Sequence, residues 1–176
     1  MIHVFIINSM VAESDLGEKL RKHLEERKDI TYFVFNTIRA GMEQEIVERM
    51  ISFFDGEHIR FYSCGGSGTM RNVVQGADGY DRAEFAFYPC GATNDFLKMF
   101  GSDLTAFRNI DNLIDGKVIN VDYIRTSYGL ALNTVSFGMD TVLADTMWET
   151  REFSIFGKLV PFILSYGNAM ISDPPR

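Results

Sequence analysis

The stretch IRFYSCGGSGTMRNVVQG, residues 59–76, contains a predicted strand, a glycine-rich loop and a predicted helix, and this order decides the fold. The apolar run at 59–63 has the length and composition of a buried strand, and the segment from Thr69 onward reads as a short helix. Three glycines and a serine lie between them, with Thr69 next, and glycine lets the backbone approach a ligand closely. The amides of such a loop and the helix N-terminus point at one place and attract an anion. The stretch therefore favours a bound phosphate, although a tight turn without a ligand explains this one loop equally well.

The same alternation of strand and helix runs through the first hundred residues. Strand-like runs lie at 2–8, 30–36, 59–63 and 83–89, and helical patterns follow them at 15–29, 42–54, 69–77 and 93–101. Apolar residues recur at helical spacing in the first two helices, at Leu16, Leu20, Leu24, Met42, Ile46, Met50 and Phe53. This order predicts an α/β fold, a Rossmann-like parallel sheet with helices on both faces, which binds ligands at the carboxyl ends of its strands. We assign residues 1–105 to this nucleotide-binding domain.

The character of the sequence changes at about residue 106. Residues 109–138 read as several short strands, with turns at Asp115-Gly116 and Tyr128-Gly129. Helical patterns follow at 140–153 and 157–171. Residues 106–176 are therefore expected to form part of a second, β-rich domain with helical segments.

Composition excludes several classes of protein. The 176-residue chain is 46% hydrophobic and 23% charged, which is typical of a globular protein. Its net charge of -7 argues against binding nucleic acid or anionic lipid through bulk electrostatics. Any membrane contact is expected to be transient. The N-terminus lacks the basic start and cleavage site of a signal peptide, so we expect a cytoplasmic protein. Cys64 and Cys90 are expected to be free thiols, and the three histidines match no metal-ligand spacing.

A second glycine-bearing loop follows the next predicted strand, in FYPCGATNDFLKMFG at 87–101. Gly91 precedes the polar residues Thr93, Asn94 and Asp95 at a predicted helix start, where helix capping by Asn94 and Asp95 is the alternative to ligand binding. The first loop lacks the lysine of a P-loop, and the first strand lacks the glycines of a dinucleotide fingerprint. Two glycine loops on adjacent strands nevertheless make a phosphate site more plausible than one loop alone.

These residues together resemble the diacylglycerol kinase catalytic-domain family, which includes bacterial lipid kinases and sphingosine kinase. The first motif stands as Gly65-Gly66-Ser67-Gly68-Thr69 with Asn72, Val73 and Gly76, and the second as Pro89-Cys90-Gly91-Ala92-Thr93-Asn94-Asp95-Phe96. Asn8, Thr37 and the segment from Asn133 to Asp140 are also similar to the family's pattern. NAD kinase, from the same superfamily, shares only the first motif.

The resemblance implies an ATP-dependent kinase that uses Mg²⁺ and passes the γ-phosphoryl group to a diacylglycerol-like or sphingoid alcohol. Nucleotide would lie in the cleft between the α/β domain and the start of a β-sandwich domain. The implied nucleotide-binding residues are Asn8, Thr37, Gly65, Gly66, Gly68, Thr69, Gly91, Thr93 and Asn94. Ser67 and Asp95 stand at the implied catalytic positions.

Two departures from the family's pattern keep alternatives open. Ser67 stands where the family has Asp, and Asn72 stands where it has Glu, so two carboxylates are missing. A catalytically impaired nucleotide-binding protein is one alternative, and an NAD-kinase-like small-molecule kinase is another. The chain is also short for the family and would hold only the opening of the second domain. Apolar surface would then be exposed, at 157–171 above all, and we expect a homo-oligomer on that ground.

Overall fold

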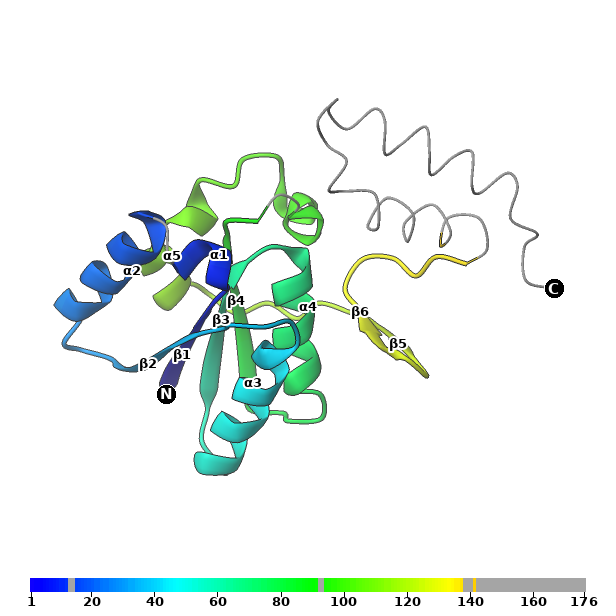
Figure 1. Ribbon diagram of the computed structural model, residues 1–176, viewed down its shortest axis with the longest axis horizontal. Helices are drawn as coiled ribbons and strands as arrows, with labels where there is room; N and C mark the ends of the chain where they lie inside the picture. The colour runs from blue at the N-terminus through cyan, green and yellow to red at the C-terminus, as the bar shows by residue number, and fades with distance from the viewer. Residues whose placement is uncertain (13–14, 92–93, 138–140, 142–176) are drawn as a thin grey trace. The chain divides into compact units, whose positions relative to one another are not determined.

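The computed structural model describes residues 1–12, 15–91, 94–137 and 141 (Figure 1). Met1–Asn133 form one compact unit and Thr134–Arg176 form another. The sheet, its helices and the candidate site all lie in the first unit. The helices predicted at 140–153 and 157–171 fall outside the described residues, apart from Thr141.

A parallel sheet of four strands forms the centre of the first unit. Its strands are β1 Ile2–Ile7, β2 Thr31–Asn36, β3 Ile59–Gly65 and β4 Ala83–Pro89, in the order β2-β1-β3-β4. Every residue of β1 and β3 is buried, as expected of strands covered on both faces. The predicted α/β fold with a parallel sheet is confirmed.

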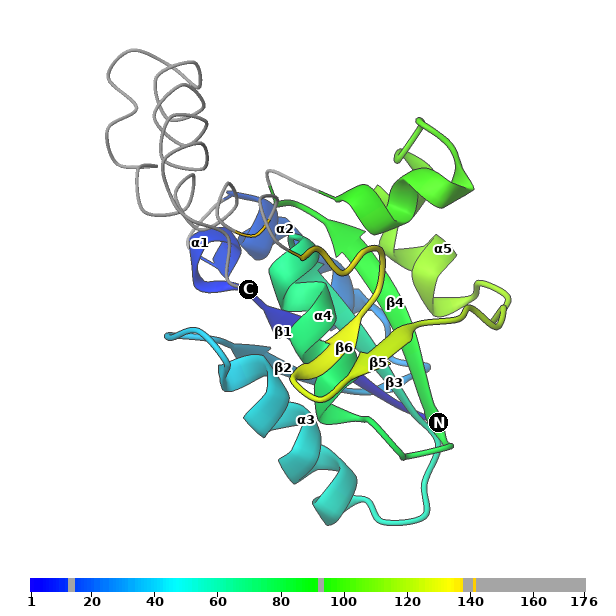
Figure 2. The same ribbon diagram turned by 90° about the vertical axis from the view of Figure 1, so that its right-hand side faces the viewer.

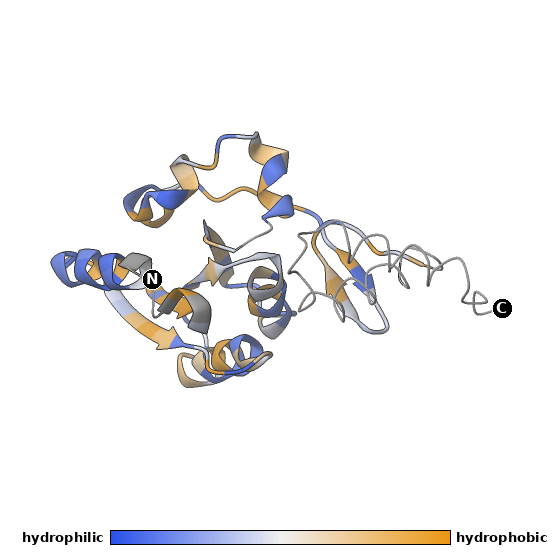
Figure 3. Ribbon diagram, turned by 45° about the horizontal axis from the view of Figure 1, so that its top comes forward, coloured by the Kyte–Doolittle hydropathy of each residue, from blue (hydrophilic) through white to orange (hydrophobic). Residues whose placement is uncertain are grey.

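Helices cover both faces of the sheet. The helices are α1 Ser9–Ala12, α2 Asp15–Glu26, α3 Met42–Phe53, α4 Ser67–Gly76 and α5 Ile110–Ile114, with 3-10 helices η1 Asp95–Phe100 and η2 Ala106–Arg108. One hydrophobic cluster joins the sheet to α1, α2 and α5, and a second joins it to α3 and α4. Hydrophobic and hydrophilic residues accordingly alternate along the helices (Figure 3).

The predicted helical stripes supply most of these contacts. Leu20 and Leu24 of α2 and Ile46 and Met50 of α3 are buried. The prediction was wrong at Phe53, whose side chain is 78% exposed. Helix α3 ends at Phe53, and the next residue, Phe54, turns inward and packs on the ring of Phe33 at a centroid distance of 5.3 Å.

The segment after β4 differs from the predicted series of short strands. Residues 110–114 form α5, because the Asn109 side chain caps this helix by accepting from the backbone N–H groups of Asp111 and Asn112 at 3.0 and 3.3 Å. The expected strands reduce to one antiparallel hairpin, β5 Ile124–Thr126 and β6 Gly129–Ala131. The predicted turn lies one residue earlier, at Ser127-Tyr128, and Gly129 begins β6 with a φ of 126°.

The hairpin packs on α4. The Gln75 side chain accepts a hydrogen bond from the Leu130 backbone N–H at 2.8 Å, and Leu130 is 4% exposed. Asp78, just after α4, pairs with Arg125 and accepts from Tyr123. Figure 2 shows the hairpin alongside α4.

Candidate phosphate-binding site

The residues that follow the four strands meet at one edge of the sheet, because parallel strands all end on the same side. Asn8 follows β1, Thr37 follows β2, Gly66 follows β3 and Gly91 comes shortly after β4. The Asn8 backbone N–H donates to the Cys64 carbonyl at 3.0 Å, and the Thr37 N–H donates to the Ile7 carbonyl at 2.9 Å. The predicted site residues that are described therefore share one edge.

The two glycine loops pack directly on each other. The Gly65 carbonyl accepts from the backbone N–H groups of both Cys90 and Gly91, each at 3.1 Å. A Cβ at Gly91 would lie 2.2 Å from the Gly66 Cα, and a Cβ at Gly65 would lie 2.5 Å from the Thr69 Oγ1. Packing alone thus explains why Gly65 and Gly91 are glycine.

Gly68 has no such explanation. A Cβ added there would meet no heavy atom of the described residues within 4 Å, and its φ lies outside the left-handed region. The residue is exposed on the first turn of α4, where alanine would be the better helix former. The space above Gly68 fits a ligand that approaches the backbone closely.

The N-terminus of α4 lies beside that space. Gly66, extended at φ −101° and ψ −169°, caps the helix, and no side chain among the described residues caps it. The Met70 N–H donates to the Gly66 carbonyl at 3.1 Å. The backbone N–H groups of Gly68 and Thr69 come before this bond in the first turn, where the helix itself offers no acceptor. These amides and the helix dipole place partial positive charge where an anion can bind.

Several polar side chains near the loop are buried or partly buried. The Thr69 side chain is 6% exposed, and its Oγ1 accepts from the Asn8 Nδ2 at 3.4 Å. Thr37 is 2% exposed at the end of β2. Cys64 lies under the same loop, and burial raises the pKa of its thiol far above the ordinary value. Burial also raises the pKa of Cys90 to about 11, so neither thiol is an activated nucleophile at neutral pH.

Asn94 contacts the second glycine loop, and Asp95 follows it as the first residue of η1. The Asn94 Nδ2 donates to the Gly91 carbonyl at 3.0 Å, while its buried Oδ1 has no partner among the described residues. The side chain of Asn94 does not cap η1, so the capping alternative for this residue was wrong. The exposed Asp95 carboxylate pairs with Lys98. Thr93 lies outside the described residues.

Ser67 and Asn72 lie on α4 at the two departures from the family's pattern. Ser67 is half-buried and begins the helix. The Asn72 Nδ2 donates to the Glu43 Oε2 at 3.3 Å, and Glu43 is 3% exposed. A carboxylate is therefore present beside position 72, supplied by α3. Sequence reasoning missed Glu43, although its spacing from Ile46, Val47 and Met50 places it on the buried face of α3.

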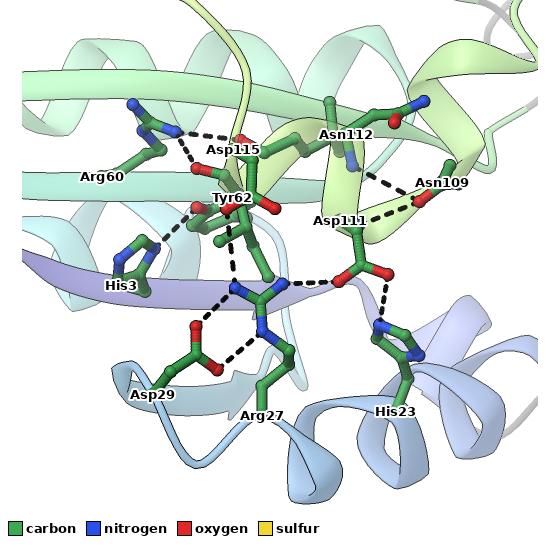
Figure 4. A network of polar contacts seen from close by, with 12 residues as sticks. His3, His23, Arg27, Asp29, Arg60, Tyr62, Asn109, Asp111, Asn112 and Asp115 are labelled. Carbon is green, nitrogen blue, oxygen red and sulfur yellow. Dashed lines mark hydrogen bonds and ion pairs between the residues drawn. The ribbon is translucent and has the colours of Figure 1, made fainter.

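A separate polar network lies toward the opposite edge of the sheet (Figure 4). Arg27 bridges Asp29 and Asp111 at 2.8 and 2.5 Å, and His23 pairs with Asp111 at 3.0 Å. The Arg27 hydrogen bonds lower the pKa of Asp29 to about 2, and the His23 hydrogen bond lowers that of Asp111. The network connects α2 and the residues after it to α5, and it includes no residue of the glycine loops.

The described residues contain neither a cluster of metal ligands nor a helix able to span a membrane. No three His, Cys, Asp or Glu side chains within those residues lie close enough to hold a metal ion. No helix in the described ranges has the length and apolar character needed to cross a membrane.

A parallel sheet with a glycine loop and a helix N-terminus at its carboxyl edge is an arrangement that favours the binding of an anion such as phosphate. The family model "Diacylglycerol kinase catalytic domain" matches residues 3–126, and the chain belongs to this family. The chain is 31% identical over 140 residues to the "Putative lipid kinase YtlR" of Bacillus subtilis (strain 168). The match covers 77% of this chain and 42% of that relative, so the chain spans less than half of the relative's length.

Proposed function

We propose that the chain binds ATP at the carboxyl edge of the sheet, with the phosphates over the first turn of α4. One observation carries this proposal: Gly68 leaves open space above an uncapped helix N-terminus, while nothing in the described packing requires glycine there. The amides of Gly68 and Thr69 would bind phosphate oxygens. Asn8, Thr37 and Asn94 would line the rest of the nucleotide site.

The proposed reaction is transfer of the γ-phosphoryl group to a diacylglycerol-like or sphingoid alcohol. Such transfer depends mostly on positioning and on neutralising phosphate charge, which amides, the helix N-terminus and a nucleotide-borne Mg²⁺ supply. Asp95 is exposed at the site and would accept the proton of the attacking hydroxyl. Ser67 would orient a phosphate oxygen or water from its position at the helix start.

A nucleotide-binding protein of low catalytic power is the second candidate. It is favoured by Ser67 at the position of the family's Asp and by the lack of a carboxylate cluster for a metal within the described residues. Glu43 does not replace that Asp, because it is buried against Asn72 between α3 and α4. Both candidate functions predict nucleotide binding, but only the first predicts efficient phosphoryl transfer to an acceptor.

The deciding experiment measures transfer of labelled γ-phosphate from Mg-ATP to diacylglycerol and to sphingosine in mixed micelles, with NAD as a third acceptor. Wild type and Ser67→Asp are compared at equal concentration. We expect a labelled lipid product that Ser67→Asp increases. Nucleotide binding without transfer in either protein would favour the second candidate, and labelling of NAD alone would favour a small-molecule kinase.

A further inference from the structure

A cavity of about 590 Å³ lies beside β4, which is one of the two edge strands of the parallel sheet. Its walls come from β4, η1, α5, the segment 116–121 and Leu132, all within the first unit. Figure 2 shows β4 between α5 and the hairpin at this side of the sheet. The volume is within the range of about 300–1,000 Å³ that is typical of small-molecule sites.

The cavity is lined mainly by hydrocarbon. The rings of Phe87, Phe96, Phe100 and Phe107 form a continuous row, with successive centroids 5.5, 6.1 and 5.6 Å apart. Val118, Ile119 and Val121 also line the cavity. A ligand held here would be recognised by burial of apolar surface.

Three of the polar side chains at the cavity, those of Arg60, Glu84 and Asn112, already have partners. Arg60 donates to Glu84 at 2.7 Å and to the Leu113 carbonyl at 3.0 Å, and the Asn112 Nδ2 donates to the Ala106 carbonyl at 3.3 Å. These groups have less to offer a sugar, a base or another polar ligand. The lining therefore fits an aliphatic chain better than a hydrogen-bonding molecule.

The cavity adjoins the candidate phosphate site through η1. Phe96 and Leu97 line the cavity, and they directly follow Asn94 and Asp95 in the chain. Phe96 and Leu97 also pack with Met70, the residue after Thr69 on the first turn of α4. One molecule could therefore place a polar end at Asp95 and an apolar chain in the cavity.

We propose that this cavity binds the hydrocarbon chain of the acceptor lipid, with the hydroxyl end directed toward Asp95. The inference rests on the proposed function, because the kinase supplies the headgroup chemistry and the cavity supplies the chain specificity. Each additional methylene buried in the cavity should tighten binding about fourfold. The affinity should stop rising with chain length once the hydrocarbon chain fills the cavity.

Direct binding tests this without requiring catalysis. The full 176-residue chain is titrated with a conjugated polyene fatty acid whose fluorescence rises in apolar surroundings. Monoacylglycerols of increasing chain length, kept below their micelle concentration, then displace the probe. We expect saturable probe binding and displacement that strengthens about fourfold per methylene.

A matched pair of variants locates the site. Phe100 lies at the rim of the cavity and is 40% exposed, whereas Phe53 lies on α3 outside the cavity and is 78% exposed. Phe100→Asp should weaken probe binding about tenfold or more, because it places a charge against an apolar ligand. Phe53→Asp should leave probe binding unchanged. Both variants should keep the wild-type melting shift with Mg-ATP.

Several results would overturn the inference. These are the absence of saturable binding, affinities independent of chain length, or equal losses in Phe100→Asp and Phe53→Asp. A dimer that Phe100→Asp dissociates, without probe binding, would assign the cavity to a second copy instead. Failed probe binding with an intact Mg-ATP shift rejects the chain site alone. Probe binding without a Mg-ATP shift supports the chain site and rejects the nucleotide proposal.

Discussion

Single glycines in this chain serve two different purposes. Gly65 and Gly91 are required because neighbouring atoms of the chain occupy the position of a Cβ. Gly68 faces open space on a helix, where glycine is unfavourable for stability. A residue that weakens the fold without serving its packing is the strongest residue-level evidence for a ligand in this structure.

Substitution by alanine should separate the two purposes. Gly68→Ala should raise the free energy of unfolding by about 0.5–1 kcal/mol, because alanine favours helix and meets no steric contact. Gly91→Ala should lower it by about 1–3 kcal/mol, because the loop must move away from Gly66. Denaturant titration of both variants measures the difference. Similar destabilisation by both would contradict the assignment of Gly68 to ligand binding.

Burial of thiol and phenol groups makes stability sensitive to alkali. Burial raises the pKa of Cys64, Cys90 and Tyr62 in the folded protein, so the unfolded chain loses these protons first as pH rises. The stability that depends on them is fully present below about pH 9 and falls as pH rises toward 11. Each group ionised only in the unfolded state contributes a slope of about 1.4 kcal/mol per pH unit.

Cys64→Ala isolates one of these groups. We expect this variant to lose less stability than wild type between pH 9.5 and 11, whatever its stability at neutral pH. Unfolding by denaturant at several pH values gives the two slopes. Parallel slopes would show that the buried Cys64 thiol does not hold its proton in the folded state.

At the scale of elements, α5 depends on contacts with the rest of the fold. Its five residues are too few to be stable alone. Asn109 caps its start, and the buried Arg60 of β3 donates to the carbonyls of Leu113 and Ile114 at its end. Glu84 of the adjacent strand balances the charge of Arg60. This support connects the sheet to one wall of the apolar cavity.

Arg60→Met should therefore destabilise the protein by about 3 kcal/mol or more, because it leaves the Glu84 charge and the helix carbonyls without their partner. Arg39→Met is the matched control. Arg39 also pairs with a glutamate, Glu45, but its side chain is 58% exposed, and its loss should cost at most about 0.5 kcal/mol. Thermal or denaturant unfolding compares them, and equal effects would mean that Arg60 has no special structural role.

Sequence patterns predicted the elements of the sheet better than those that follow it. The four strands are continuous apolar runs bounded by turn residues, and long-range packing reinforces that local preference. Residues 110–114 were mistaken for strand because the deciding feature, the cap by Asn109, involves one side chain and no periodic pattern. Residues 115–123 contain β-branched residues but have no strand partner in the described structure.

At the scale of the whole molecule, much of the candidate site could be predicted because it depends on topology. Parallel strands bring Asn8, Thr37 and both glycine loops to one edge, whatever the details of packing. Glu43 and the cavity beside β4 depend on how helices pack on the sheet, which local sequence does not specify. Local sequence likewise does not specify which hydrophobic side chains lie exposed on the surface.

The predicted self-association stays a prediction, and some exposed hydrophobic side chains of the described residues allow it to be tested. Val118, Ile119, Ile124 and Tyr128 are 56%, 59%, 45% and 96% exposed. We expect the sedimentation coefficient to rise with protein concentration, and a Tyr128→Asp, Ile124→Asp double variant to reduce the rise. A wild-type chain that sediments as a monomer at high concentration would refute the prediction.

The most direct test of the phosphate site is the melting temperature of wild type and Gly68→Ala with and without saturating Mg-ATP. At about 100 times the dissociation constant, binding should stabilise wild type by about 2.7 kcal/mol, a shift of several degrees. Gly68→Ala should melt higher than wild type without nucleotide and show a much smaller shift with it. No shift in wild type, or an equal shift in both proteins, would contradict nucleotide binding over the first turn of α4.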